Sequence, residues 1–135
     1  MEISRNEYQE IAMSIIYDTL TYDSMNVQYD IKELMSDISG LEYEEIDLFL
    51  KEIVVKSINY QEEIIAKIEP KLVNWKFSRL NRLTQAILIL SVAHYYYVGD
   101  VDKAIVINIA VVLAKRYLID QDYKFVNALL DNVLC

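Results

Sequence analysis

The sequence has few residues that bend or break a helix. Its 135 residues include only two glycines and one proline. Sheet proteins and long loops need more turn-forming residues than this, so the composition favours helices joined by short connections. The length suits one compact domain that buries a hydrophobic core of its own.

Cysteine and histidine are scarcer still. Cys135 and His94 are the only residues of their types. A single cysteine cannot form an internal disulfide, and one histidine with one cysteine does not make a cluster of metal ligands. We therefore expect no metal and no other cofactor, and we expect a protein of the reducing cytoplasm.

Long apolar runs and enzyme motifs are also missing. No stretch reaches the roughly 18 apolar residues of a membrane span, because Ser91 and His94 interrupt the densest one, residues 86–98. The first residues lack the basic start and apolar run of a signal peptide. Glycine-rich phosphate loops, nucleophile elbows and metal-binding spacings are absent from the sequence, so we expect that it is not an enzyme.

Apolar residues make up 54% of the chain and recur at steps of three and four. Such stripes predict amphipathic helices. They cover about residues 4–20, 30–38, 43–58, 78–97 and 101–117, with another between residue 60 and Pro70 and a last one from about residue 121. Residues 21–26 are expected to form a loop. The second half of the helix at 78–97 and the helix at 101–117 are apolar nearly all round, which is typical of buried central helices.

Acidic residues outnumber basic ones, 21 to 13, which gives a formal net charge of −8. This charge repels nucleic acid, but screening limits the repulsion to about 8 Å at physiological salt, so a local basic patch can still bind RNA. Arg79 and Arg82 are three residues apart and would share a helix face. The candidates for contacting RNA phosphates are Arg5, Lys71, Lys76, Arg79, Arg82 and Lys124. The alternative is an ordinary solvated basic face.

Several motifs resemble those of one known family. They are Arg-Leu-Thr-Gln-Ala-Ile-Leu at 82–88, Val-Ile-Asn-Ile-Ala at 106–110, Leu-Ala-Lys-Arg-Tyr at 113–117 and Lys-Phe-Val-Asn-Ala-Leu-Leu-Asp at 124–131, with Ile-Ala-Met-Ser-Ile-Ile-Tyr at 11–17. The pattern is similar to that of the NusB family of transcription antitermination factors, and it spans essentially the whole chain. The chain is identified as a divergent NusB-like member.

The resemblance implies an all-α, NusB-like bundle of about seven helices in one domain, residues 1–135. The domain would consist of two packed subbundles, about 1–58 and 59–135. The resemblance also implies binding of a boxA-type single-stranded RNA together with NusE, a small-subunit ribosomal protein, in the synthesis of ribosomal RNA. Tyr17 matches a family tyrosine on the partner-binding side and either faces the partner or packs in the core. Thr84 stands where the family often has an acid. Members occur as monomers or homodimers.

The chain also departs from the family pattern. Only Arg5 remains of an arginine-rich N-terminal arm, and Ile89, His94 and Ile109 replace an arginine and two glutamates. Joint loss of both partners of a buried ion pair can be neutral or stabilising, so we interpret these three positions as one coupled replacement. A NusB-fold protein-interaction module that has lost RNA binding is therefore the alternative function. A third possibility, a detached relative of the NusB-like part of ribosomal RNA cytosine methyltransferases, would lack its catalytic domain.

Several polar and aromatic residues have structural interpretations. His94 is expected to be packed or hydrogen-bonded rather than a ligand. Asn108 and Asn127 are expected to bond backbone groups at helix crossings. Residues 95–97, three consecutive tyrosines, point in three directions and are expected to pack at the boundary of the core.

Overall fold

The computed structural model describes residues 4–135, and every regular element in that range is helical. The α-helices are α1 (Arg5–Ser24), α2 (Ile31–Ser39), α3 (Leu48–Asn59), α4 (Gln61–Ile68), α5 (Arg82–Ala93), α6 (Lys103–Tyr117) and α7 (Asp122–Val133). Three 3₁₀ turns, η1 (Tyr43–Glu45), η2 (Glu69–Lys71) and η3 (Phe77–Arg79), and a π-helical turn, η4 (His94–Val98), complete the chain. The predicted all-α bundle of about seven helices is confirmed.

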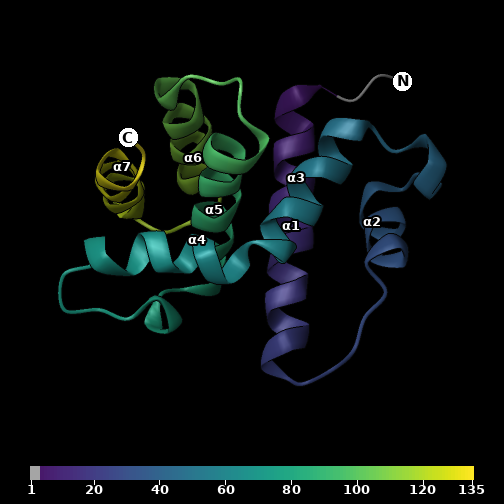
Figure 1. The fold of residues 1–135 in the computed structure, drawn as a ribbon, viewed down its shortest axis with the longest axis horizontal. Coiled ribbons are helices and arrows are strands. Elements are labelled where there is room, and N and C mark those ends of the chain that lie inside the picture. The colour runs from purple at the N-terminus through teal and green to yellow at the C-terminus, as the bar shows by residue number, and fades with distance from the viewer. Residues whose placement is uncertain (1–3) are drawn as a thin grey trace.

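Helix α1 runs through the middle of the molecule (Figure 1). It packs most extensively against α5 and α3, while α6 and α7 pack against each other. In Figure 1, α2 lies to one side of α1, and α4 and α7 lie to the other. Buried residues from both halves of the chain join in one hydrophobic cluster. The division into subbundles near residue 58 stays a prediction.

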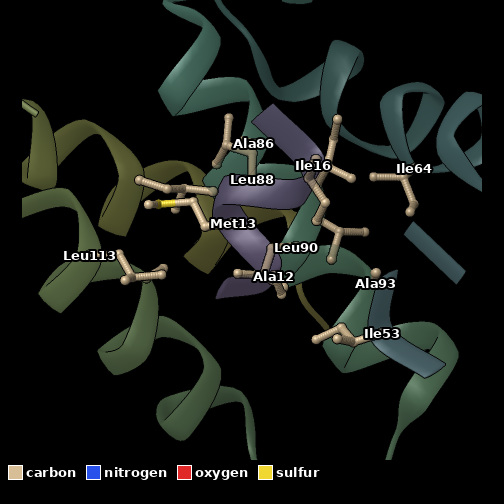
Figure 2. Close-up of a cluster of buried hydrophobic side chains, with 14 of the residues drawn as sticks. Ala12, Met13, Ile16, Ile53, Ile64, Ala86, Leu88, Leu90, Ala93 and Leu113 are labelled. Atoms are coloured by element: carbon tan, nitrogen blue, oxygen red, sulfur yellow. The ribbon is translucent and has the colours of Figure 1, made fainter. Parts of the chain in front are cut away.

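Helix α5 is the centre of the core. Every residue from Ala86 to Ala93 is buried, as its apolar sequence predicts. Figure 2 shows Leu88 and Leu90 of α5 beside Met13 and Ala12 of α1. Burial of a whole leucine side chain stabilises a fold by roughly 1.5–3 kcal/mol, so this contact between α1 and α5 contributes strongly to the stability of the fold.

Helix α6 differs from the prediction that it is buried all round. Ile105 and Val112 are about half exposed, and the buried residues of the helix are Val106, Ala110, Leu113 and Ala114. The helix contacts α7 and α5 but only the edge of α1. Its remaining apolar face is therefore left uncovered.

Capping residues explain where the predicted boundaries were right and wrong. Ser4 caps α1, since its Oγ accepts the Glu7 N–H at 3.2 Å. The predicted loop at residues 21–26 is wrong up to Ser24, because α1 continues to that residue. In its last turns the hydroxyls of Thr21 and Ser24 donate to the carbonyls of Tyr17 and Thr21 at 3.0 and 2.7 Å. The helices predicted from residues 43 and 78 begin later, at Leu48 and Arg82, each after a side-chain cap.

These two caps have the same geometry. Asn81 accepts the backbone N–H of Leu83 at 2.9 Å, and this starts α5. Asp47 does the same before α3 with the N–H of Phe49 at 2.7 Å. Among residues 4–135, no helix is long and apolar enough to cross a membrane.

Candidate nucleic-acid interface

The connection between α4 and α5 is held at one residue, Phe77. Its side chain is buried, and its backbone N–H donates to the Glu69 carboxylate at 3.0 Å. The Gln85 amide donates to the carbonyls of Phe77 and Leu80 at 3.0 and 3.1 Å. These bonds close the connection into a defined loop, so the residues between Glu69 and Phe77 are presented to solvent in a fixed shape.

A groove opens on the outer side of this loop. It has a volume of about 500 Å³ and is lined by Asn74, Trp75, Lys76 and Arg79. Asn74 has a φ of +62°, a left-handed conformation that asparagine adopts more readily than most residues. Beside this reversal, Trp75 is 57% exposed, so much of its indole ring meets solvent.

The groove combines the two features that bind single-stranded nucleic acid. An exposed aromatic face stacks on a base, and neighbouring cations bind phosphates. In the described part of the chain, neither Lys76 nor Arg79 forms an ion pair, and both are exposed. Their charges are therefore free to meet an anion. Lys71 is also exposed and ends the η2 turn just before the loop.

Arg82 lies close by in sequence but has a different environment. Its guanidinium donates to the hydroxyls of Thr21 and Ser24 at 3.2 and 3.3 Å and is partly buried. The expectation that it shares a helix face with Arg79 is wrong, because Arg79 belongs to η3 and Asn81 separates the two elements. Arg82 ties the start of α5 to the end of α1.

Arg5 and Lys124 are not part of the groove. Arg5 begins α1, about 24 Å along the helix axis from Thr21 at 1.5 Å per residue, and its guanidinium lies 4.0 Å over the Phe49 ring. Lys124 is exposed in the first turn of α7. The structure therefore brings Lys76 and Arg79 together in the groove and places Lys71 in the preceding η2 turn. Arg5 and Lys124 lie on other elements.

The two residues predicted to bind a protein partner are largely inside the molecule. Tyr17 is partly buried on α1 and packs against the core. Thr84 is 4% exposed in the first turn of α5. Thr84 therefore offers a partner almost no surface in this conformation, whereas part of Tyr17 remains accessible.

His94 is buried, as predicted for a packed histidine. Its ring contacts Phe49 edge to face, with centroids 5.5 Å apart, and its Nδ1 lies 3.4 Å from the Gln9 amide nitrogen. Burial, and then the positive charge of Arg5, lower the pKa of His94 below its ordinary value of 6.5. Ile89 is also buried and Ile109 partly so. Their replacement together with His94 as a coupled set remains a hypothesis.

The three tyrosines of η4 behave as predicted. They are partly buried, and their hydroxyls donate to the carbonyls of Cys135 and Val133 and to the Glu63 carboxylate. The asparagines do not: Asn108 and Asn127 are exposed, and their side chains form no hydrogen bond with any residue in 4–135. That expectation was wrong because both lie on the open side of α6 and α7, where they line a groove of about 640 Å³.

Sequence reasoning missed the exposure of Trp75. Trp75 was not among the predicted site residues, yet the flanking residues 73–76 carry no helical stripe, and this was the available signal. Within residues 4–135, no group of three or more His, Cys, Asp or Glu side chains could hold a metal ion. The fold and the groove thus define a small helical protein with a surface suited to nucleic acid.

Comparisons with known proteins agree with this class. The NusB family model matches residues 6–134, so the chain belongs to the NusB family. The transcription antitermination protein NusB of Finegoldia magna is 32% identical over 133 residues, with 98% of this chain and 94% of the relative covered. That of Listeria innocua is 30% identical over 131 residues, with 97% and 96% covered.

Solved structures share the fold. T. maritima NusB matches with a TM-score of 0.82 at 22% identity, covering 98% of this chain and 92% of that one. A structure of the antitermination factors NusB and NusE in complex with double-stranded RNA matches with a TM-score of 0.77 at 23% identity, covering 96% and 94%. At these identities the likeness concerns the arrangement of the helices.

Proposed function

We propose that this protein is a non-enzymatic transcription antitermination factor of the cytoplasm that binds boxA-type RNA together with the ribosomal protein NusE. Membership of the NusB family and the names of its relatives support this proposal. The observation that carries it is the groove in which exposed Trp75 lies beside Lys76 and Arg79. In this proposal Trp75 stacks on a base, and Lys71, Lys76 and Arg79 bind the flanking phosphates.

The other predicted residues take supporting roles in the proposal. Arg5 and Lys124 contact the RNA away from the groove, and Arg82 holds α1 and α5 together behind it. Tyr17 faces NusE, and Thr84 acts from beneath that surface. The protein works as a monomer or homodimer, which sedimentation at two concentrations would distinguish.

A titration of labelled boxA-type RNA tests the proposal, with and without NusE, at two salt concentrations. Three phosphate contacts predict a slope of about −2 for log affinity against log salt on a single strand. Lys76→Gln and Arg79→Gln should each weaken binding and make the slope shallower by about 0.7. Lys32→Gln, on the exposed face of α2, is the control with the same charge change. Absence of binding even with NusE present would contradict the proposal.

The protein-interaction module is the second candidate, and a specific observation favours it. Residues 18–52 carry ten acidic and two basic residues. Met25 and Leu48 of this segment are 55% and 77% exposed. An acidic surface with exposed apolar residues suits a basic protein and repels RNA. Binding of NusE without any measurable RNA binding would support this candidate.

A further inference from the structure

One buried polar atom within residues 4–135 has no hydrogen-bond partner. Gln9 of α1 is 1% exposed, and its side-chain oxygen is the buried side-chain atom in this range that accepts no hydrogen bond. Its amide nitrogen lies 3.4 Å from Nδ1 of His94, which is long for a hydrogen bond. An unpaired buried acceptor destabilises the free protein, and such exceptions call for an explanation.

Gln9 lines a pocket of about 100 Å³ between α1 and α6. One wall is apolar and is formed by Ile109, Val112 and Leu113 of α6. The carboxamides of Asn6 and Asn108, both exposed, stand at the rim. This space equals roughly three water molecules at about 30 Å³ each, enough for the edge of one small ring.

An ion pair between Glu10 of α1 and Arg116 of α6 connects the two helices beside the pocket. Both of these residues line the pocket, and the carboxylate of Glu10 is already matched by a cation. Arg5, one turn before Gln9, adds positive charge that also lowers the pKa of His94. A cationic donor would therefore meet no free anion and an unfavourable field. A neutral N–H donor carried by a polyanion would be attracted.

We infer that this pocket receives the exocyclic amino group of one unpaired cytosine or adenine, which donates a hydrogen bond to the side-chain oxygen of Gln9. The apolar wall of α6 contacts the ring, and Asn6 and Asn108 offer further donors and acceptors along its edge. Glutamine and asparagine carboxamides commonly read the amino edge of bases in this way. The inference rests on the proposed RNA binding and adds base selectivity to it.

The pocket is separate from the Trp75 groove. The two sites share no lining residue, because the pocket lies between α1 and α6 and the groove lies on the connection between α4 and α5. The groove then supplies affinity through charge and stacking, whereas the pocket distinguishes amino bases from bases without that group.

The test uses the full chain and a labelled boxA-type RNA with changes to single groups of its bases. Each cytidine is replaced in turn by 2-pyrimidinone riboside, and each adenosine by purine riboside, so that only the amino group is lost. At one position this loss should weaken binding about fivefold, the value of one hydrogen bond. Gln9→Leu should reduce that ratio to about one, and Gln9→Glu, which keeps an acceptor, should preserve it.

A stability measurement separates a binding role from a structural one. Removing an unpaired buried acceptor should leave the melting temperature of the free Gln9→Leu protein unchanged or raised. Gln85→Leu is the matched control, because the Gln85 amide has two backbone partners, and this variant should melt at a lower temperature. Equal losses of stability in both variants, with base preference intact in Gln9→Leu, would overturn the inference.

The remaining outcomes are distinguishable. If no amino group matters while Lys76→Gln still weakens every RNA, the inference fails and the proposed function stands. If no RNA binds with or without NusE, both fail. If Gln9→Leu weakens binding of NusE in the absence of RNA, the pocket serves a protein donor instead and the inference is wrong.

Discussion

Arg79 and Arg82 show how differently two neighbouring cations are used. Arg79 is exposed and its charge is unpaired within the described residues, so it is available to a ligand. The guanidinium of Arg82 instead bonds two hydroxyls of α1. Arg79 therefore affects mainly binding, and Arg82 affects mainly stability.

Replacing Arg82 with alanine should lower the free energy of unfolding by about 1 kcal/mol, because two long, partly exposed hydrogen bonds between α1 and α5 are lost. Urea unfolding measures this change. Arg79→Ala is the control and should stay within about 0.5 kcal/mol of the unchanged protein. Equal destabilisation by the two substitutions would show that Arg82 has no special structural role.

His94 should titrate below its ordinary pKa of 6.5, because burial and the charge of Arg5 both disfavour the imidazolium. As the only histidine, it gives one assignable imidazole signal in NMR. Since the folded pKa is lower than the unfolded one, the unfolded chain binds the proton more readily. Stability is therefore complete above about pH 6.5 and declines as the pH falls toward and through the folded pKa.

The contribution of Arg5 can be tested in the same titration. Arg5→Gln should raise the pKa of His94. His94→Gln should flatten the stability profile from roughly pH 7 down to about pH 5, which is above the ordinary pKa of carboxylates. A pKa for His94 that does not change in Arg5→Gln would remove the electrostatic part of this explanation and leave burial alone.

At the scale of single residues, the sequence predicted which side chains are buried better than it predicted which residues they contact. His94 was correctly expected inside, because it interrupts an apolar helix. Arg82 was not separated from Arg79, since the rule that residues three apart share a face holds only within one helix. Asn81 caps α5 between them, and an asparagine inside an apolar stripe does not reveal on which side of it the helix begins.

Among the elements, the π-helical turn η4 has the clearest structural task. Tyr96 donates to the Val133 carbonyl at 2.9 Å and accepts the Cys135 N–H at 3.1 Å, so it holds the end of α7. Tyr97 stacks on Tyr60 with centroids 4.4 Å apart. The turn thus connects α5 both to the last residues and to the junction of α3 and α4.

Tyr96→Phe should destabilise the protein by about 1 kcal/mol, because it keeps the ring and removes both hydrogen bonds. Hydrogen exchange should accelerate first in the last turn of α7. Tyr123→Phe is the matched control, since the Tyr123 hydroxyl bonds to no residue in 4–135 and its ring meets the Lys115 ammonium. Unchanged exchange in α7 after Tyr96→Phe would mean that packing alone fixes this end.

Helices were predictable from periodicity, but the turns between them were not. The stripe of α5 located the core helix. Gly40 ends α2 with a φ of +76°, which suits a residue without a side chain. The helix predicted from residue 43 divides into η1 and α3, because Asp47 caps the second element. Whether a capping residue ends one helix and begins the next depends on the path of the backbone, and the amino-acid composition does not reveal that path.

At the scale of the whole molecule, charge is unevenly distributed. Residues 18–52 carry a formal charge of −8, which equals that of the entire chain, while the remaining residues balance at eleven acidic and eleven basic. Much of the acidic segment is α2, η1 and the start of α3, on the right of Figure 1, whereas the loop after α4 lies at the lower left. The groove therefore stands on the neutral part of the protein.

Replacing Glu42, Glu44 and Glu45 together with glutamine should speed RNA association several-fold at low salt. At about 0.01 M salt the screening length is about 30 Å, so these carboxylates act on an RNA at the distant groove. At physiological salt the effect should nearly vanish. Stopped-flow association at both concentrations checks this, and an equal acceleration at high salt would indicate a direct contact instead.

The placement of the helices relative to one another could not be predicted from the periodicity of apolar residues. Nothing in the stripes indicated that α6 would expose Ile105 and Val112, because an apolar face does not specify whether a neighbouring helix covers it. The family resemblance predicted the helical bundle. The groove at Trp75 could not be predicted from the sequence, because it depends on the conformation of the loop after Pro70.

The segregated charge also acts before any contact is made. A polyanion pushes the acidic end of the protein away, and this exerts a torque that turns the opposite side toward the strand. A protein of equal net charge with evenly spread carboxylates would meet the RNA in random orientations. At low salt we therefore expect a larger share of collisions to begin with the side that carries Trp75, so a chain that is acidic overall can still encounter RNA productively.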